Sequence, residues 1–188
     1  MNKRKIISRQ IPLLIMWLMA SALLWGFVIN LLTDTRPEHK IVVFADMKVP
    51  DGTGLAVELE KEKPEGISMI RVHPFTYAMM DGKELSNADL YIIPESDFAI
   101  CVDWFASVPE SLRKGQTLFI AEDGEAYGIR IAESSEYGID FGWLHYYGDE
   151  PLYLTFGANS LHLSNLEGAV DNGAEACAER LLELLKTN

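Results

Sequence analysis

Cysteine, histidine and basic residues are scarce in this sequence: its 188 residues include two cysteines, four histidines and 16 Lys or Arg, against 28 Asp or Glu. Cys101 and Cys177 stand neither in a Cys-x-x-Cys pair nor beside a histidine at zinc-ligand spacing, which excludes the usual structural zinc sites. The two cysteines could form a disulfide or be buried apolar side chains. The formal net charge of −12 repels phosphate groups, so nucleic-acid binding is disfavoured.

The motifs of common catalytic sites are also missing. The sequence has no Gly-x-Ser-x-Gly nucleophile elbow and no His-Glu-x-x-His metal motif. The segment Gly52-Thr-Gly54 lacks the third glycine and the lysine of a phosphate-binding loop. We therefore expect no catalytic residues, no metal and no cofactor, and a protein that is not an enzyme.

One long uncharged run, Ile11 to Leu32, does stand out, and it follows four basic residues: Lys3, Arg4, Lys5 and Arg9. A helix of this length spans roughly 30 Å, the thickness of the hydrocarbon core of a bilayer. Because Lys and Arg are retained on the cytoplasmic side, the pattern predicts a cytoplasmic tail at 1–10, a transmembrane signal anchor at 11–32 and an extracytoplasmic remainder. The expected location is the plasma membrane, with a single pass.

A cleaved secretory signal is the alternative interpretation of this run. Ala20, Ser21 and Ala22 give the small-x-small pattern of signal-peptidase sites. The apolar run continues well beyond them to Leu32, however, whereas the apolar part of a signal peptide has only about 7 to 15 residues. An uncleaved anchor is therefore favoured.

Behind the run, residues 33–39 form a short polar stalk, and residues 40–188 suffice for one domain but not for two. Apolar segments predict five strands: Lys40–Ala45, Ile67–His73, Ala88–Pro94, Thr117–Ala121 and Leu152–Phe156. Helices are expected from Thr53 to about Lys63 and from Asn172 to Lys186. The turn Asp123-Gly124 predicts that Ala126–Ile131 forms a hairpin with the fourth strand. The alternation of strands and helices predicts an α/β domain.

Three segments carry a resemblance to a known family. Asp123-Gly-Glu-Ala-Tyr-Gly-Ile129 resembles the Asp-Gly-x-x-Tyr-Gly-Ile segment of the extracellular solute-binding proteins of ABC transporters. Tyr153–His162, with the Ala-rich helix that follows it, is similar to a strand, turn and helix of this family, and Lys40–Ala45 fits the family's first strand. The resemblance implies a type II periplasmic-binding-protein-like fold and a role as a binding or accessory component beside an ABC transporter permease.

Members of that family enclose their ligand between two lobes, whereas this chain has residues for about one. The insertion that forms the second lobe is reduced to about residues 132–151. The expected fold is therefore α/β, with an N-terminal transmembrane helix followed by a single three-layer lobe that has a mostly parallel sheet. His162, before the last helix, is expected to cap or pack.

Polar residues follow the first three predicted strands, where open α/β sheets bind ligands: Asp46, His73, Glu95, Ser96 and Asp97. Carboxylates at this edge could accept the hydroxyl hydrogen bonds of a polyol or hold a divalent cation. Alternatively, Asp46 caps a loop, His73 ends a strand, and the three residues after the third strand begin a helix with acids at its positive end.

Aromatic residues are numerous for one domain: Trp104, Phe105, Tyr127, Tyr137, Phe141, Trp143, Tyr146 and Tyr147. Trp143, Tyr146 and Tyr147 occupy the region of the missing lobe and could stack on a sugar ring, which would make the ligand a carbohydrate or another small solute. Alternatively, these rings cover the exposed sheet edge and dock another membrane protein, as in a scaffold or sensor that binds no ligand.

Overall fold

The computed structural model describes residues 3–33, 35–46, 53–75, 83–133, 139–142, 144–146 and 148–187. The chain divides into two compact units, Met1–Thr35 and Arg36–Asn188. Each unit is described by itself below.

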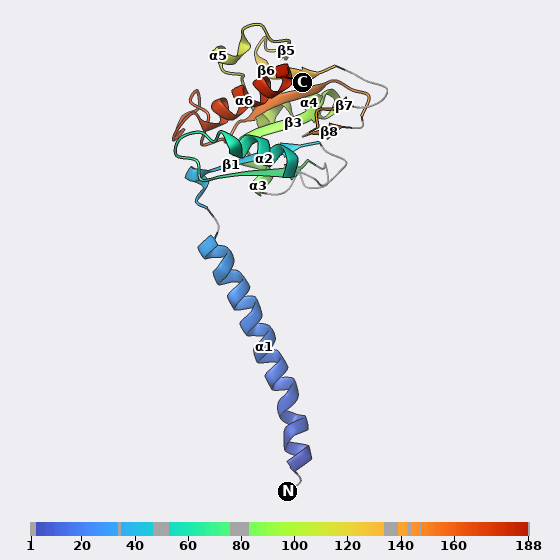
Figure 1. Cartoon of the computed structure of the whole chain (residues 1–188), viewed down its shortest axis with the longest axis vertical. Coiled ribbons are helices and arrows are strands. Elements are labelled where there is room, and N and C mark those ends of the chain that lie inside the picture. The colour runs from blue at the N-terminus through green and yellow to red at the C-terminus, as the bar shows by residue number, and fades with distance from the viewer. Residues whose placement is uncertain are drawn as a thin grey trace. The chain divides into compact units, whose positions relative to one another are not determined.

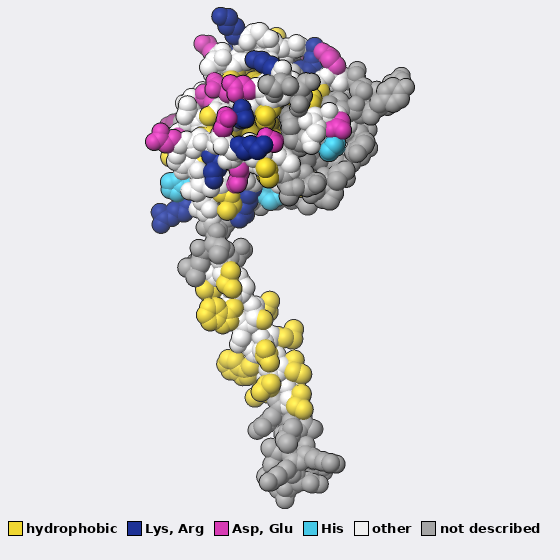
Figure 2. All heavy atoms as spheres, in the orientation of Figure 1, with side chains coloured by type: hydrophobic (Ala, Val, Ile, Leu, Met, Phe, Trp, Pro, Cys, Tyr) yellow, Lys and Arg dark blue, Asp and Glu magenta, His cyan; other side chains and the backbone are white. Residues whose placement is uncertain are grey.

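The first unit is a single helix, α1 (Lys3–Thr33). Its segment Ile11–Ile29 is long and apolar enough to cross a membrane, and none of that segment is buried. Hydrophobic side chains crowd this helix in Figure 2. Length and composition are therefore those of the predicted anchor, which remains a prediction because a signal sequence near the N-terminus has the same properties.

The second unit begins with a 3-10 turn, η1 (Pro37–His39), in the predicted stalk. Strands and helices follow in this order: β1 (Lys40–Ala45), α2 (Thr53–Lys61), β2 (Met69–Pro74), α3 (Lys83–Ser86), β3 (Leu90–Pro94), α4 (Glu95–Cys101), η3 (Val102–Trp104), β4 (Phe105–Ala106), α5 (Glu110–Arg113), β5 (Leu118–Ile120), β6 (Ala126–Ala132), β7 (Ile139–Asp140), β8 (His145–Tyr146), β9 (Leu152–Gly157) and α6 (Gly173–Thr187). The five predicted strands, the hairpin and both predicted helices are confirmed, with shifts of a few residues at their ends.

The main sheet has the order β2-β1-β3-β9-β6-β5, and β4 pairs with β9 as well (Figure 1). β1 pairs in parallel with β2 and β3, as the crossovers predict. The pairings of β9 with β3, β4 and β6 and of β5 with β6 are antiparallel, so the sheet is mixed. β7 and β8 form a separate two-stranded sheet. The domain is therefore α/β, as expected.

Both faces of the sheet are covered, which gives three layers. On one face Ile41 and Val43 of β1 share a hydrophobic cluster with residues of α2 and α6. On the other, Val42 and Phe44 of the same strand share a cluster with residues of α3 and α4. Burial of alternate residues on opposite faces explains why β1 is apolar at every position between Ile41 and Ala45.

The two cysteines lie in different layers. Cys101 belongs to the cluster that contains Phe44, and Cys177 to the cluster that contains Ile41, so the sheet separates them. Both are buried and both are free thiols. The disulfide alternative is therefore wrong, and the interpretation as buried apolar side chains is confirmed.

Candidate functional site

At the carboxyl end of β1, the structure places Asp46 near Tyr146, a residue of β8. The backbone N–H of Asp46 donates to the carbonyl of Ile92 on β3, at 2.7 Å. Burial and, to a smaller extent, the negative charges of Asp46 and Glu150 together raise the pKa of Tyr146 to about 12. Tyr146 is only 5% exposed, so its ring belongs to the core. The expectation that this ring stacks on a sugar at the surface is corrected accordingly.

At the carboxyl end of β3, Glu95 and Asp97 lie in the first turn of α4. The N–H of Ser96 donates to Oε2 of Glu150 at 2.8 Å, and the N–H of Glu95 donates to the carbonyl of Pro151 at 3.1 Å. Burial, and then the charge of Glu150, raise the pKa of Asp97. The alternative that these acids begin a helix is therefore confirmed, and Glu150 interacts with both the start of α4 and Tyr146.

The remaining residues of the predicted site are His73, Trp143 and Tyr147. His73 packs its ring on Phe44 of β1, with the ring centroids 5.3 Å apart. Trp143 and Tyr147 lie outside the described residues. Among the residues that the structure describes, no group of three or more His, Cys, Asp or Glu is arranged to hold a metal ion. Ligand binding by Asp46, His73, Glu95 and Asp97 stays a prediction.

A buried polar network connects the loop before α6 to the start of the domain. Asp89 accepts hydrogen bonds from the N–H of Val42, at 2.8 Å, and from the hydroxyl of Ser160, at 2.6 Å. His162 donates its backbone N–H to the Ser160 hydroxyl at 3.1 Å. Its ring nitrogens contact Asp171 Oδ1 at 2.8 Å and the carbonyl of Pro37 at 2.9 Å.

This network contains serine, histidine and aspartate but lacks the geometry of a catalytic triad. A triad needs the imidazole bonded to the serine oxygen, so that it can remove the serine's proton. Here both ring nitrogens of His162 are already bonded to other groups, and the Ser160 hydroxyl donates to Asp89. Asp89, Ser160 and His162 are at most 4% exposed, so a substrate could not reach them. The packing role expected for His162 is confirmed.

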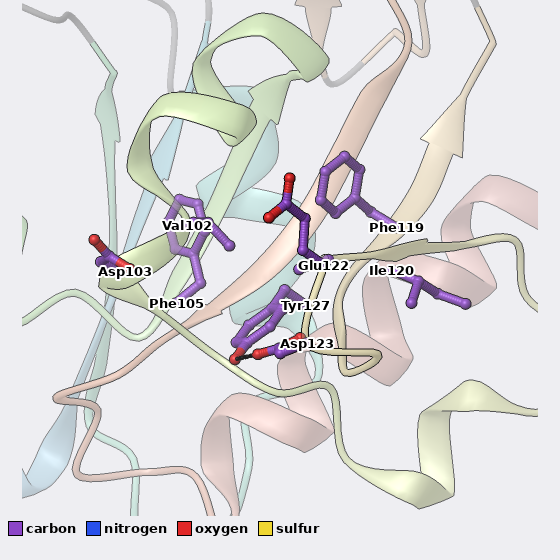
Figure 3. Close-up of a pocket in the computed structure, with 9 residues that line it drawn as sticks. Val102, Asp103, Phe105, Phe119, Ile120, Glu122, Asp123 and Tyr127 are labelled. Atoms are coloured by element: carbon purple, nitrogen blue, oxygen red, sulfur yellow. Dashed lines mark hydrogen bonds between the residues drawn. The ribbon is translucent and has the colours of Figure 1, made fainter.

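An open pocket of about 650 Å³ lies between η3, β4 and the turn that joins β5 to β6 (Figure 3). The residues that line it are Val102, Asp103, Phe105, Phe119, Ile120, Ala121, Glu122, Asp123 and Tyr127. Phe105 and Phe119 each contact Phe98, with ring centroids 4.9 and 4.4 Å away, so the floor is the edge of a packed aromatic cluster. The fixed rings give the pocket a preformed apolar base.

Acidic groups form the other part of this pocket. The carboxylate of Glu122 lies between the side chains of Phe105 and Phe119 in Figure 3. Tyr127 donates its hydroxyl to Asp123 at 2.7 Å. Hydrogen bonds from the N–H of Glu125 and from Tyr127 lower the pKa of Asp123, so this carboxylate is ionised at neutral pH.

The pocket lies at the opposite end of the sheet from the predicted strand-end site. β9 runs antiparallel to β3, and β6 runs antiparallel to β9, so β6 begins at the amino end of β3. The turn before β6 therefore lies away from the strand ends that carry Asp46 and Glu95. The rule that ligands bind at the carboxyl ends of parallel strands predicts a site elsewhere, so the sequence did not indicate this pocket. The signals that could have indicated it are the hairpin at Asp123 and the aromatic residues Phe105 and Tyr127.

Fold and pocket define the class of the protein: a three-layer α/β domain with an open, acidic and aromatic pocket, preceded in the chain by an apolar helix. No protein-family model matches the chain, and no curated protein is significantly similar to it in sequence.

Proposed function

We propose that the protein is a membrane-anchored binding protein related to the solute-binding proteins of ABC importers, with its α/β domain outside the plasma membrane. The apolar stretch Ile11–Ile29 of α1 is the single-pass anchor, and the basic residues that precede this stretch keep the N-terminus in the cytoplasm. The domain acts as a binding or accessory component beside a transporter permease and catalyses no reaction.

The observation that carries this proposal is the pocket between η3, β4 and the β5–β6 turn. Its volume of about 650 Å³ lies within the range of roughly 300–1,000 Å³ that is common for small-molecule sites. It combines rings held by a packed core with a few polar groups at its edge, the usual composition of such sites. The nearest approach to a catalytic arrangement, at His162, is closed and fully bonded, which supports a binding role.

Crosslinking in native membranes tests the proposal. A photoreactive amino acid replaces Ile120, which is 62% exposed beside the pocket, and the full-length protein is purified after irradiation. The matched control carries the same group at Val57 of α2, which is 56% exposed on a different layer. We expect ABC permease subunits to be crosslinked from position 120 and not from position 57. Recovery of no transporter component from either position would overturn the importer proposal.

A second candidate function is a scaffold or sensor that binds no solute and docks another membrane protein. The specific observation in its favour is β5, which among the described strands pairs with β6 alone, at the end of the sheet order, and exposes Ile120. Edge strands of this kind can pair with a partner chain. In the same experiment, one dominant non-transporter membrane protein crosslinked from position 120 would favour this function.

A further inference from the structure

The pocket at the β5–β6 turn combines negative charge with open aromatic surface. Three of the residues that line it are acidic: Asp103, Glu122 and Asp123. Within the described part of the chain, none of its lining residues is Lys, Arg or His. The three carboxylates therefore have no positive side chain among the lining residues, and they produce a negative potential over the aromatic floor.

The groups around Glu122 suit one kind of ligand. A positive charge beside this carboxylate would share the pocket with Phe105 and Phe119, which line it together with Glu122 (Figure 3). The face of an aromatic ring attracts a cation through its quadrupole, and most strongly where water is excluded. Tyr127 offers another ring, fixed in position by its hydrogen bond to Asp123.

A bare metal ion fits these groups poorly. Calcium needs about six to eight oxygen ligands, and magnesium needs near-octahedral oxygen geometry. Among the described residues, no three acidic or histidine side chains converge in that way, and rings occupy much of the lining. A neutral solute would not compensate the negative charges of the carboxylates. An organic cation can interact favourably both with the aromatic rings and with the negatively charged carboxylates.

We propose that this pocket binds a small organic ammonium ion, with the charged nitrogen beside Glu122 and the apolar part of the ligand against Phe105 and Phe119. This ligand class rests on the proposed function as a binding protein. With a volume of about 650 Å³, the pocket has room for more than a simple ammonium ion, so amines with several carbons or a second positive charge fit as well.

Ligand-observed NMR on the full-length protein in detergent micelles tests the ligand class. Tetramethylammonium and a linear alkyl diamine are the cationic probes, and neopentyl alcohol is a neutral probe of similar size to the first. We expect both cations to bind and the alcohol to bind at least about tenfold more weakly, because it lacks the charge. The diamine distinguishes a site for a primary ammonium from one for a quaternary ammonium.

Two variants locate the binding. Glu122→Gln removes the central charge and keeps the shape of the side chain, and we expect it to weaken cation binding by about five- to thirtyfold. Glu110→Gln on α5 is the control, because Glu110 is exposed and is not part of the pocket lining. It should bind both cations as the unchanged protein does.

The outcomes separate the ligand class from the proposed function. Cation binding that does not respond to Glu122→Gln, or that the alcohol matches, overturns the ammonium proposal. Binding of neutral sugars at the pocket without any binding of cations also overturns it and leaves the binding function standing. If neither cations nor sugars bind, while position 120 crosslinks a non-transporter protein, both proposals are wrong.

Discussion

At the scale of single residues, His162 is buried and has a hydrogen-bond partner at each ring nitrogen. The carbonyl of Pro37 can only accept a hydrogen bond, and an ionised Asp171 carboxylate can also only accept one. The ring satisfies both partners only when it carries a proton on each nitrogen. Burial lowers the pKa of His162, but the hydrogen bonds to Pro37 and Asp171 and the charges of Asp89 and Asp171 outweigh it, so the pKa is raised.

A raised histidine pKa makes stability depend on pH in a defined direction. The contribution of His162 is fully present below the pKa of the unfolded chain, about 6.5, and is lost as the pH rises through the higher pKa of the folded state. Burial raises the pKa of Asp89, so its contribution to stability is also lost as the pH rises. We therefore expect the free energy of unfolding to fall as the pH increases from about 6 to 9.

The variant His162→Gln should remove most of the dependence above pH 6 and cost about 1–3 kcal/mol at pH 6, because a buried partner loses its hydrogen bond. Denaturant unfolding of the full-length protein in micelles, followed by tryptophan fluorescence, measures both effects. His145→Gln is the control, since His145 pairs with Asp140 at the surface, with side chains 42% and 69% exposed. Equal losses in the two variants would contradict the assignment.

Gly157 is a second residue with a specific requirement. A Cβ built there would lie 1.9 Å from the carbonyl oxygen of Ala88, and the N–H of Gly157 already donates to the carbonyl of Asp89. Gly157→Ala should therefore cost about 3 kcal/mol in the same unfolding measurement. Gly124→Ala is the comparison: its φ of +84° strains an alanine, but no atom lies within 4 Å of the added Cβ. We expect it to cost only about 1 kcal/mol, and similar losses at both sites would argue against the close approach.

At the scale of secondary-structure elements, the layers keep Cys101 and Cys177 apart. Burial raises the pKa of both thiols, that of Cys177 to about 12. We expect neither thiol to react with a maleimide in the folded protein, and both to react in denaturant without any reductant. Mass spectrometry of the labelled chain counts the adducts. Labelling that requires prior reduction would show a disulfide instead.

Elements with a strong apolar pattern could be predicted from the sequence, and weakly patterned ones could not. β1 and β3 are apolar at nearly every position because helices cover both faces of the sheet. β7 and β8 have two residues each, too few to show an alternation, and no strand was predicted between residues 133 and 150. The sequence also could not place β9 between β3 and β6, because the partners of a strand are chosen by long-range packing.

At the scale of the whole molecule, the proposed anchor gives a direct prediction. If Ile11–Ile29 is an uncleaved membrane anchor, alkaline carbonate should leave the full-length protein in the membrane fraction, with its N-terminus intact. N-terminal mass spectrometry of the membrane-bound protein checks both points. Ala20→Leu, which disrupts the small-x-small pattern, should change nothing. A soluble chain that begins near Ser21 to Leu23 would instead establish the cleaved signal.

The sequence by itself determined the features that depend on local pattern: the apolar helix, the main strands, the Asp123-Gly124 hairpin and the α/β class. These follow from residue spacing and turn chemistry, which act between near neighbours along the chain. Only the tertiary structure decided that Tyr146 is buried, that Glu150 accepts a hydrogen bond at the start of α4, and that Phe105, Phe119 and Glu122 line one pocket. Such meetings depend on strand order and on packing between distant segments, which no local pattern specifies.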